Sequence, residues 1–516
     1  MRRIGKKAWL LAIASGVLQV LVFPAPDLYW LGWICLAPLL VALGSPRADG
    51  ERPSPGQGFL LAWTAGILWI AVSCYWIYDT LRVYGHLHPL IAAGLLLLFC
   101  LYFAIPHGLF GMLFALAARL PRLGTGLALA LSPAFWVTAE LLRARSGPFP
   151  WDLLGTSQVE NVPLARIATV TGVYGLSFAI VVVNAAFALA WLLPAPRRRA
   201  TLVAGLASVL ALQAGVVMKP SPSPAAQTAV LVQPNIPILD ANWTMEFFQQ
   251  TLEHMSRLSA SGSQQAPSPR LVVWPESPAP FYERDPRFRE PVSQAAQATD
   301  SWIVAGTLGT RPAGPESARR SEVLNSASLI SPQGEWTGRY DKVHLVPFGE
   351  YVPFRRILFF AESLTKEVGD FTPGERRTVM RIDGHEIAVV ICFEAIFPDE
   401  VRQFVAGGAE VLVNISNDTW LGQSGGVRQH LNMARMRAIE NRRWVLRATN
   451  SGITAVIDPE GRVVARAARD AAAALVAPYG FVSSTTFYTR HGDVFAFLCA
   501  IITIAALAWA LRPART

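Results

Sequence analysis

Long apolar stretches constrain this chain more than any other feature of its sequence. Eight windows are poor in charged residues, at about 8–23, 29–44, 59–78, 89–117, 125–142, 167–193, 200–218 and 493–511. A helix of about 20 apolar residues is long enough to cross a bilayer. The windows therefore predict a membrane protein with seven helices, followed much later in the chain by an eighth. The 89–117 window is long for one crossing, so we expect it to tilt or to include an interfacial part.

The interval 219–492 is a different kind of sequence and predicts one large water-exposed domain. It holds most of the charged residues, and the Pro/Ser-rich segment 219–226 marks its start. The expected domains are a seven-helix membrane domain (1–218), the polar domain (219–492) and a last helix with its tail (493–516). With 52% hydrophobic and 16% charged residues, the composition excludes a disordered chain, a coiled coil and an ordinary soluble enzyme.

Lys and Arg are distributed unequally between the two sides of the expected membrane domain. The poorer set of short loops holds Arg82, Arg143, Arg145 and Arg166. The richer set of helix ends holds Arg2, Arg3, Lys6, Lys7, Arg47, Arg52, Arg119, Arg122, Arg197, Arg198, Arg199, Arg512 and Arg515. Because cytoplasmic loops are enriched in Lys and Arg, the 219–492 domain is expected to face away from the cytoplasm. The formal charge of +9 is then a topology signal, and no nucleic-acid partner is indicated.

The basic N-terminus followed by an apolar core leaves a signal peptide open as an alternative to a first membrane helix. No clear small-x-small cleavage site precedes Phe23. Cleavage would remove one helix without inverting the others.

The polar domain contains one cysteine, Cys392, which cannot form a disulfide within that domain. It is therefore either a buried thiol or a reactive one. The other four, Cys35, Cys74, Cys100 and Cys499, lie in apolar windows, where a small buried hydrophobic residue is the simplest interpretation.

Short strand-like runs alternate with helical patterns through the polar domain. The runs are 229–232, 271–274, 302–308, 327–330, 386–391, 410–415, 444–449, 453–457 and 462–465, and the clearest helical patterns are 244–259 and 430–441. This alternation predicts an α/β layered domain with a central mixed sheet.

Polar residues with chemical potential lie just beyond these strands. Glu276 follows the run Leu271-Val-Val-Trp-Pro, Cys392 ends the run that starts at 386, and the segment 338–350 supplies Lys342 and Glu350. Ligand sites collect at strand ends in α/β sheets. A carboxylate can serve as base for a thiol, and a lysine can stabilise an oxyanion. The spacing of these residues alone leaves structural alternatives open. Cys392 could be a packed core residue, Glu276 a capping residue, and Lys342 a surface partner of Asp341.

Together, four motifs make the polar domain resemble the carbon–nitrogen hydrolase (nitrilase) superfamily. They are Trp274-Pro-Glu276, Tyr340-Asp-Lys342, Cys392-Phe-Glu394 and Asn414-Ile-Ser-Asn-Asp-Thr-Trp420. The resemblance implies an αββα sandwich with a Glu–Lys–Cys triad. The whole chain is similar to the apolipoprotein N-acyltransferase family, which places such a domain between membrane helices seven and eight. Further matches are the segments 149–158, 232–237 and 346–351.

The resemblance also implies roles for individual residues. Glu276 would be the general base, Lys342 the oxyanion stabiliser and Cys392 the nucleophile. Glu350 would orient Lys342 or assist proton transfer, and Glu394 would support the nucleophile. Trp243 and Trp420 resemble aromatic residues near a lipid entrance, although core or interfacial tryptophans remain an equal alternative. Phe393 departs from the family, which commonly has Tyr after the nucleophile; its backbone N–H remains available for an oxyanion hole.

The implied reaction is acyl transfer through a Cys thioester. The donor would be a phospholipid, preferably phosphatidylethanolamine, and the acceptor the α-amine of diacylglyceryl-cysteine apolipoproteins. The implied location is the bacterial inner membrane, with the catalytic domain on the periplasmic side. No cofactor and no metal are implied. The run containing Phe354, Leu358, Phe359 and Phe360 is a candidate lid, with packing on the domain's own core as the alternative.

Three other interpretations remain to be weighed. The first is a membrane-anchored nitrilase-type amidase that hydrolyses a small amide with the same triad. The second is a transporter with an accessory domain, for which Glu140 and Asp79 are the candidate intramembrane charges. The third concerns Arg435, Arg437, Arg442 and Arg443, which are expected to form a solvated face or internal ion pairs rather than meet lipid phosphates.

Overall fold

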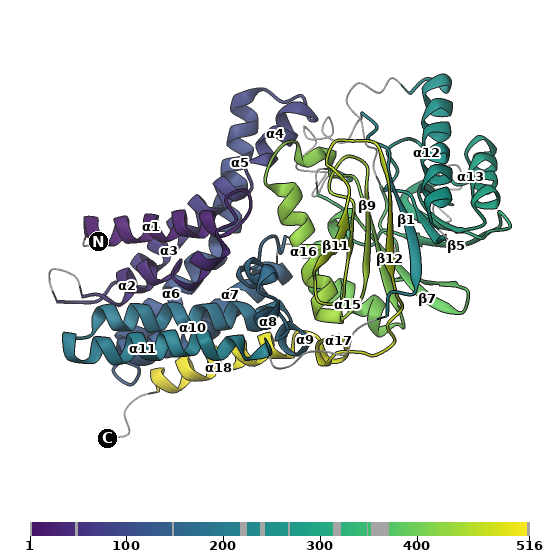
Figure 1. Cartoon of the computed structure of the whole chain (residues 1–516). Helices are drawn as coiled ribbons and strands as arrows, with labels where there is room; N and C mark the ends of the chain where they lie inside the picture. The colour runs from purple at the N-terminus through teal and green to yellow at the C-terminus, as the bar shows by residue number, and fades with distance from the viewer. Residues whose placement is uncertain are drawn as a thin grey trace.

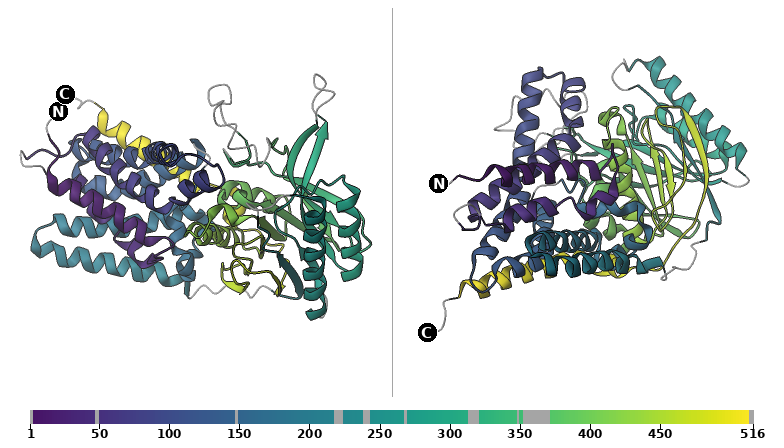
Figure 2. Two further views of the ribbon diagram at one scale, coloured as in Figure 1. Left: turned by 90° about the horizontal axis from the view of Figure 1, so that it is seen from above. Right: turned by 60° about the vertical axis from the view of Figure 1, so that its left-hand side comes forward.

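The computed structural model describes residues 3–46, 50–146, 149–216, 224–237, 243–266, 269–312, 321–347, 349–351 and 371–512. A helical bundle and an α/β sandwich lie side by side (Figure 1). Helix α1 begins and helix α18 ends at the end of the bundle remote from the sandwich, which all views agree on (Figures 1 and 2).

The bundle contains both long helices and short helical pieces. The longer helices are α1 (Lys6–Val22), α3 (Pro55–Ser73), α5 (Pro89–Phe103), α6 (Ile105–Arg119), α7 (Gly124–Ser146), α10 (Val173–Leu192), α11 (Ala195–Leu212) and α18 (Val494–Leu511). The shorter ones are η1 (Tyr29–Trp33), α2 (Ala37–Gly44), α4 (Trp76–Val83), η2 (Leu154–Glu160), α8 (Val162–Ala165), α9 (Ala168–Thr171) and η3 (Gln213–Val216).

Five helical spans among the described residues are long and apolar enough to cross a membrane: 55–73, 89–119, 124–146, 173–192 and 494–511. Helix α1 has only 17 residues, and α11 carries three consecutive arginines in its first turns. By the same length and composition, neither is both long and apolar enough to cross a membrane. The 29–44 window is divided between η1 and α2. The total of eight crossings therefore stays a prediction.

The 89–117 window bends instead of simply tilting. Helices α5 and α6 meet at Ala104, and Figure 1 shows α5 turned away from the direction that the bundle helices share. Several large apolar side chains of α5 are exposed, among them Leu90, Leu97 and Leu98. Such a helix is suited to lipid, since lipid tails cover apolar surface without cost.

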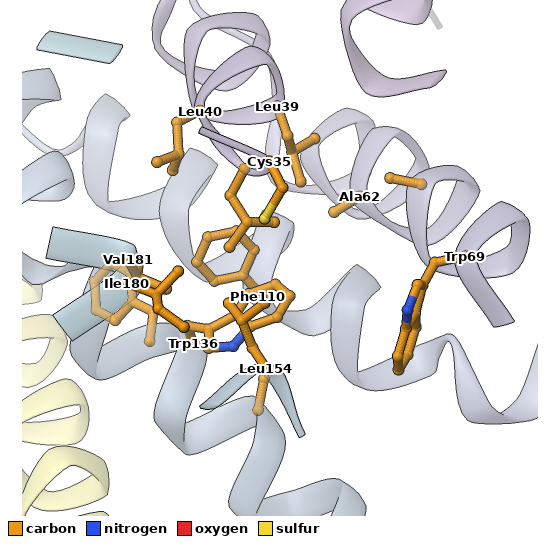
Figure 3. Close-up of a cluster of buried hydrophobic side chains, with 14 of the residues drawn as sticks. Cys35, Leu39, Leu40, Ala62, Trp69, Phe110, Trp136, Leu154, Ile180 and Val181 are labelled. Carbon is orange, nitrogen blue, oxygen red and sulfur yellow. The ribbon is translucent and has the colours of Figure 1, made fainter. Parts of the chain in front are cut away.

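Close helix packing and aromatic residues form the bundle's core. Gly58 of α3 and Gly111 of α6 face each other so closely that a Cβ on Gly58 would lie 2.4 Å from the Gly111 carbonyl oxygen. Small residues allow this approach in membrane helices. Trp69, Phe110 and Trp136 are buried members of the same apolar core (Figure 3). The four cysteines of the apolar windows are free and buried, as predicted.

The sandwich contains two six-stranded sheets, so the expectation of one central sheet is wrong. The first sheet has the order β12-β1-β2-β3-β4-β5 and the second the order β11-β10-β9-β8-β7-β6. The strands are β1 (Gln227–Gln233), β2 (Pro269–Val273), β3 (Trp302–Pro312), β4 (Ser321–Ile330), β5 (Trp336–Asp341), β6 (Val379–Ile382), β7 (His385–Ile391), β8 (Val411–Ser416), β9 (Val445–Thr449), β10 (Ala455–Ile457), β11 (Val463–Arg466) and β12 (Ala473–Tyr479). Both sheets are mixed: β1-β2-β3 and β7-β8-β9 pair in parallel, and the remaining neighbours are antiparallel.

The layers follow the order expected for an αββα sandwich. One apolar core, with Leu231, Val273, Val389 and Val413 among its members, lies between the sheets. Helices α12 (Met245–Gln265) and α13 (Pro286–Thr299) cover the outer face of the first sheet. Helices α15 (Pro398–Ala406) and α16 (Gly426–Asn441) lie on the second sheet, with α16 between the sheets and the bundle (Figure 1).

Helix α16 is buried on almost every side, and this explains its unusual sequence. Two of its arginines are internal: Arg435 binds Glu160 of η2 at 2.5 Å, and Arg437 pairs with Glu440 at 2.9 Å. Arg443, just after the helix, donates to the carbonyl oxygens of Ala409 and Ser484. Because buried charges need such partners, these arginines are held inside the protein rather than face lipid phosphates, and Arg435 joins the sandwich to the bundle.

Candidate active site

Cys392 lies at the end of the buried strand β7, where the chain turns into the short helix η6 (Cys392–Ile396). Its φ of +51° is in the left-handed region, which is uncommon for a residue other than glycine. Such backbone strain concentrates at functional sites. Cys392 packs at the boundary between the apolar core of the sandwich and that of the bundle, and keeps some solvent exposure. The thiol therefore lies where the two parts of the molecule meet.

Glu276 and Lys342 come together from two other strand ends. Glu276 follows β2 and Lys342 follows β5, and both side chains are buried. The Lys342 Nζ atom lies 3.0 Å from Glu350 Oε1 and 3.4 Å from Glu276 Oε1. Asn325 of β4 donates its side-chain amide to both carboxylates, at 2.8 Å to Glu276 and 2.6 Å to Glu350. One lysine and one amide thus hold two buried carboxylates beside each other.

The backbone also orients the two carboxylates. The N–H of Asn417, just after β8, donates to Glu276 Oε2 at 2.9 Å. The N–H of Val346 donates to Glu350 Oε2 at 2.7 Å. Each carboxylate is therefore fixed at both oxygens, which leaves little freedom for rotation.

The charges around Cys392 keep it a thiol at neutral pH. Burial and the negative charge of Glu276 raise the pKa of Cys392, and the positive charge of Lys342 only partly opposes them. Burial disfavours the charge of Lys342, but the carboxylates of Glu350 and Glu276 outweigh it and raise the lysine's pKa. The Cys392 thiol must lose its proton before the sulfur can act as a nucleophile. The Glu276 carboxylate beside it can accept that proton, and Lys342 keeps a positive charge in the site.

Glu394 joins the nucleophile turn to the lysine segment. Its Oε1 accepts from the Tyr340 hydroxyl at 2.7 Å and from the N–H groups of Val343 at 2.8 Å and His344 at 3.1 Å. Its Oε2 accepts from the Ile391 N–H at 2.8 Å. The residues flanking Cys392 and Lys342 are therefore tied to one fully buried carboxylate.

The aromatic residues predicted near a lipid entrance occupy different places. Trp420 lies on η7 (Asp418–Leu421), with its ring centroid 4.6 Å from that of Tyr84, which follows α4. Its backbone oxygen accepts from Thr80 at 2.8 Å, so α4 of the bundle holds this loop. Trp243 packs on Phe247 at the start of α12 and against the outer cluster of the sandwich, away from the bundle. The candidate lid containing Phe359 and Phe360 lies outside the described residues.

Phe393 and the two intramembrane acids were also singled out by sequence. The Phe393 ring is buried against Phe149, with centroids 6.1 Å apart. Glu140 is buried and accepts from the Leu154 N–H at 2.7 Å, so it holds the 149–160 segment; Asp79 is exposed. Among the described residues no group of three or more His, Cys, Asp or Glu is placed to hold a metal ion.

The sequence did not reveal the residues that hold Glu276, Glu350 and the Cys392 turn in place. Asn325 was not distinguished because a single polar residue in a strand reads as outward-facing. Asp418 and Asn417 lie inside the quoted 414–420 motif but were given no role. His430 was given no role, because its contact with the Cys392 turn depends on where α16 packs.

Comparisons with known proteins agree with this architecture. Residues 228–478 match the carbon–nitrogen hydrolase family model, and residues 15–186 match the model of the apolipoprotein N-acyltransferase N-terminal domain. Among solved structures, a nitrilase-superfamily protein of Saccharomyces cerevisiae covers 49% of this chain and 90% of its own, at 20% identity and a TM-score of 0.38.

Curated relatives match over nearly the full length. The apolipoprotein N-acyltransferase of Geobacter metallireducens is 37% identical over 98% of this chain and 96% of its own. That of Nitrosomonas europaea is 33% identical over 96% of both chains. That of Methylococcus capsulatus is 34% identical over 94% of this chain and 93% of its own. With this similarity across both the bundle and the sandwich, the chain belongs to the apolipoprotein N-acyltransferase family.

Proposed function

We propose that this protein transfers an acyl chain from a phospholipid to the α-amino group of the N-terminal diacylglyceryl-cysteine of apolipoproteins, through a thioester on Cys392. The observation that carries the proposal is the joining of Glu276, Lys342 and Cys392 at the boundary between the sandwich and a membrane-type bundle. Family membership supports the same activity.

In the first half-reaction, Glu276 accepts the proton of the Cys392 thiol. The sulfur attacks the carbonyl carbon of an ester in the phospholipid, and the carbonyl oxygen becomes negative. Lys342 Nζ and the Phe393 N–H stabilise this oxyanion. The C–O bond then breaks, Glu276 returns its proton to the departing alkoxide, and a lysophospholipid leaves a thioester behind.

In the second half-reaction, the neutral α-amine of the lipoprotein attacks the thioester carbonyl. Glu276 takes the proton from the amine nitrogen, the C–S bond breaks, and the sulfur of Cys392 is reprotonated. The product carries an amide-linked acyl chain, and the enzyme is regenerated. Exclusion of water from the thioester favours transfer over hydrolysis.

The finer assignments belong to the same proposal. The unequal Lys and Arg distribution supports an inner-membrane protein whose sandwich faces the periplasm. Phosphatidylethanolamine is the proposed donor. Glu350 orients Lys342, and Trp420, held by α4, borders the lipid entrance. Trp243 is kept in the proposal as a second aromatic substrate-binding residue, although it packs on Phe247.

The test is intact-mass spectrometry of protein purified from membranes, with wild type beside Cys392→Ala. We expect a hydroxylamine-labile mass increase of one fatty acyl group in wild type and none in the variant. Addition of a diacylglyceryl peptide should discharge it and yield the N-acyl peptide. If no adduct forms with phospholipid while Cys392 remains alkylatable, the proposal fails and the amidase alternative takes its place.

A further inference from the structure

A buried polar chain lies directly behind the nucleophile and is not used in the mechanism above. His430 Nε2 lies 3.1 Å from the backbone oxygen of Cys392. His430 Nδ1 lies 2.9 Å from Asp418 Oδ1, and Arg447 donates to Asp418 Oδ2 at 2.6 Å. All three side chains are buried, with side-chain exposures of 3% or less. A set of charged groups buried this completely requires every member to be paired.

The contact with Cys392 has a defined direction. A carbonyl oxygen only accepts hydrogen bonds, so the Nε2 nitrogen carries hydrogen and donates to it. The oxygen belongs to the peptide unit between Cys392 and Phe393. Because this unit is planar and trans, its carbonyl and the Phe393 N–H point in opposite directions. Fixing the carbonyl therefore fixes the Phe393 N–H.

The Cys392–Phe393 peptide needs surrounding contacts to keep its conformation. The left-handed φ of Cys392 is unfavourable for a residue with a side chain and persists only where surrounding contacts impose it. A donor on the carbonyl supplies such a contact. It also polarises the amide, which strengthens hydrogen bonds donated by the N–H at its other end.

The imidazole is itself fixed from two sides. Asp418 also accepts from Ser416 Oγ at 2.8 Å, and Arg447 also contacts the side-chain oxygen of Asn414. On the other side the Trp151 ring lies 5.9 Å from the His430 ring, between centroids. His430 thus has little rotational freedom.

The same turn of α16 is attached to the bundle. Trp151 Nε1 donates to Gln429 Oε1 at 2.8 Å, and Gln429 Nε2 donates to the carbonyl oxygens of Pro24 at 2.7 Å and Ser73 at 3.2 Å. Three bundle segments therefore set the place of the helix turn that carries His430.

We propose that His430, oriented by Asp418 and Arg447, is a positioning residue that aims the Phe393 N–H at the oxyanion of the acyl-transfer reaction. The inference rests on the proposed function, because it assumes an oxyanion formed by attack of Cys392. It adds that the membrane bundle, through Trp151 and Gln429, contributes to the geometry of the catalytic turn.

The test compares His430→Gln with His430→Met. The two side chains have similar length and volume, but only Gln has an N–H donor. We expect His430→Met to slow single-turnover thioester formation about 100-fold, the effect typical of a misplaced reacting group or a lost oxyanion donor. The KM for phospholipid should change by less than about twofold, because the substrate is not contacted. Thioester formation in His430→Gln should be at least tenfold faster than in His430→Met.

A second readout separates positioning from general loosening of the site. Alkylation of Cys392 by iodoacetamide forms no carbonyl oxyanion, so per folded molecule its rate should change by less than about threefold in His430→Met. Equal losses of alkylation and acylation would overturn the proposal. So would equal acylation rates for the Gln and Met variants.

The matched control is His254→Met, because His254 Nε2 also contacts a backbone oxygen, that of Pro234, at 3.1 Å, but on the outer helix α12. It should leave the acylation rate unchanged; a loss as large as that of His430→Met would contradict the proposal. If His430→Met does not fold, Trp151→Phe replaces it. That variant keeps an aromatic ring but removes the hydrogen bond from Trp151 to Gln429. An unchanged rate of thioester formation in it would count against the role of the bundle. Absence of a thioester in wild type would instead refute the proposed function itself.

Discussion

Replacing Glu394 with Gln should cost both stability and catalytic rate, because one carboxylate serves four donors. A Gln oxygen can occupy only one of the two carboxylate positions. In the better orientation it keeps Tyr340, Val343 and His344 as donors, but its NH₂ group then faces the Ile391 N–H. One buried N–H loses its acceptor, at a cost of about 1–3 kcal/mol, and the other three bonds lose their charge assistance.

A compensating gain reduces this loss. Burial raises the pKa of Glu394, which means that its charged form is held at some cost, and a neutral Gln avoids that cost. This gain offsets part of the lost charge assistance, so we expect a net destabilisation of about 1–3 kcal/mol, close to the cost of the one N–H left without an acceptor. Glu394→Ala leaves four donors without an acceptor and should cost about 4 kcal/mol or more, a large share of a typical folding free energy.

The assay is thermal unfolding in detergent, together with thioester formation at a temperature where every variant is folded. Tyr340→Phe is the matched control, since it removes one of the four donors and should cost about 1–2 kcal/mol. Glu394→Gln should also slow thioester formation, because Glu394 links Ile391, next to the nucleophile, with Val343, next to Lys342. A Gln variant within about 0.5 kcal/mol of wild type and fully active would refute this reasoning.

Three further outcomes follow from the site. Glu276→Gln should slow acyl transfer by roughly 1,000-fold or more, because the base is lost. The same change should speed alkylation of Cys392 at pH 9, because the Glu276 charge raises the pKa of Cys392. A parallel fall in both rates would contradict this. The pKa of Asp418 is lowered by Arg447 and His430 despite burial, so its stabilising contribution is complete above its ordinary pKa of 3.8 and is lost as the pH falls below it. The difference in unfolding temperature between wild type and Asp418→Asn should accordingly shrink below about pH 4, and a constant difference would argue against it. Tyr84→Phe removes the 2.6 Å hydrogen bond to the Thr419 oxygen and should lower lysophospholipid release several-fold by loosening η7, whereas an unchanged rate would show that α4 does not hold that loop.

The sequence predicted the parts of the site that depend on local order along the chain. Glu276 and Cys392 each follow a strand that a short-range apolar pattern predicts, whereas Lys342 was found through its motif and the family resemblance. The alternation of strands and helices suggested one central sheet, and only the family resemblance implied two, because the division into sheets depends on long-range pairing: β12, rich in alanine, pairs with β1 from almost 250 residues away. Strand β5, with a glycine and charged residues, lacks an apolar pattern of its own.

The supporting residues were beyond prediction for a related reason. Asn325 becomes informative only when β4 brings it between two carboxylates that are far apart in sequence. His430 becomes informative only when α16 lies behind the nucleophile. Polar residues whose roles are set by packing carry no local signature, unlike the residues that perform the chemistry.

The burial of α16 has a consequence for how the protein is made. Residues 426–441 are synthesised after every described helix of the bundle except α18, and the partners of Gln429, Arg435 and Glu440 include backbone and side-chain groups of those earlier segments. The sandwich therefore completes its fold against helices that are already inserted, which serve as its template. Without the bundle, Gln429, Arg435 and Glu440 would each lose a partner, and the helix turn that carries His430 would lose the contacts that fix its place. Catalytic competence and correct membrane assembly are in this way acquired in the same step.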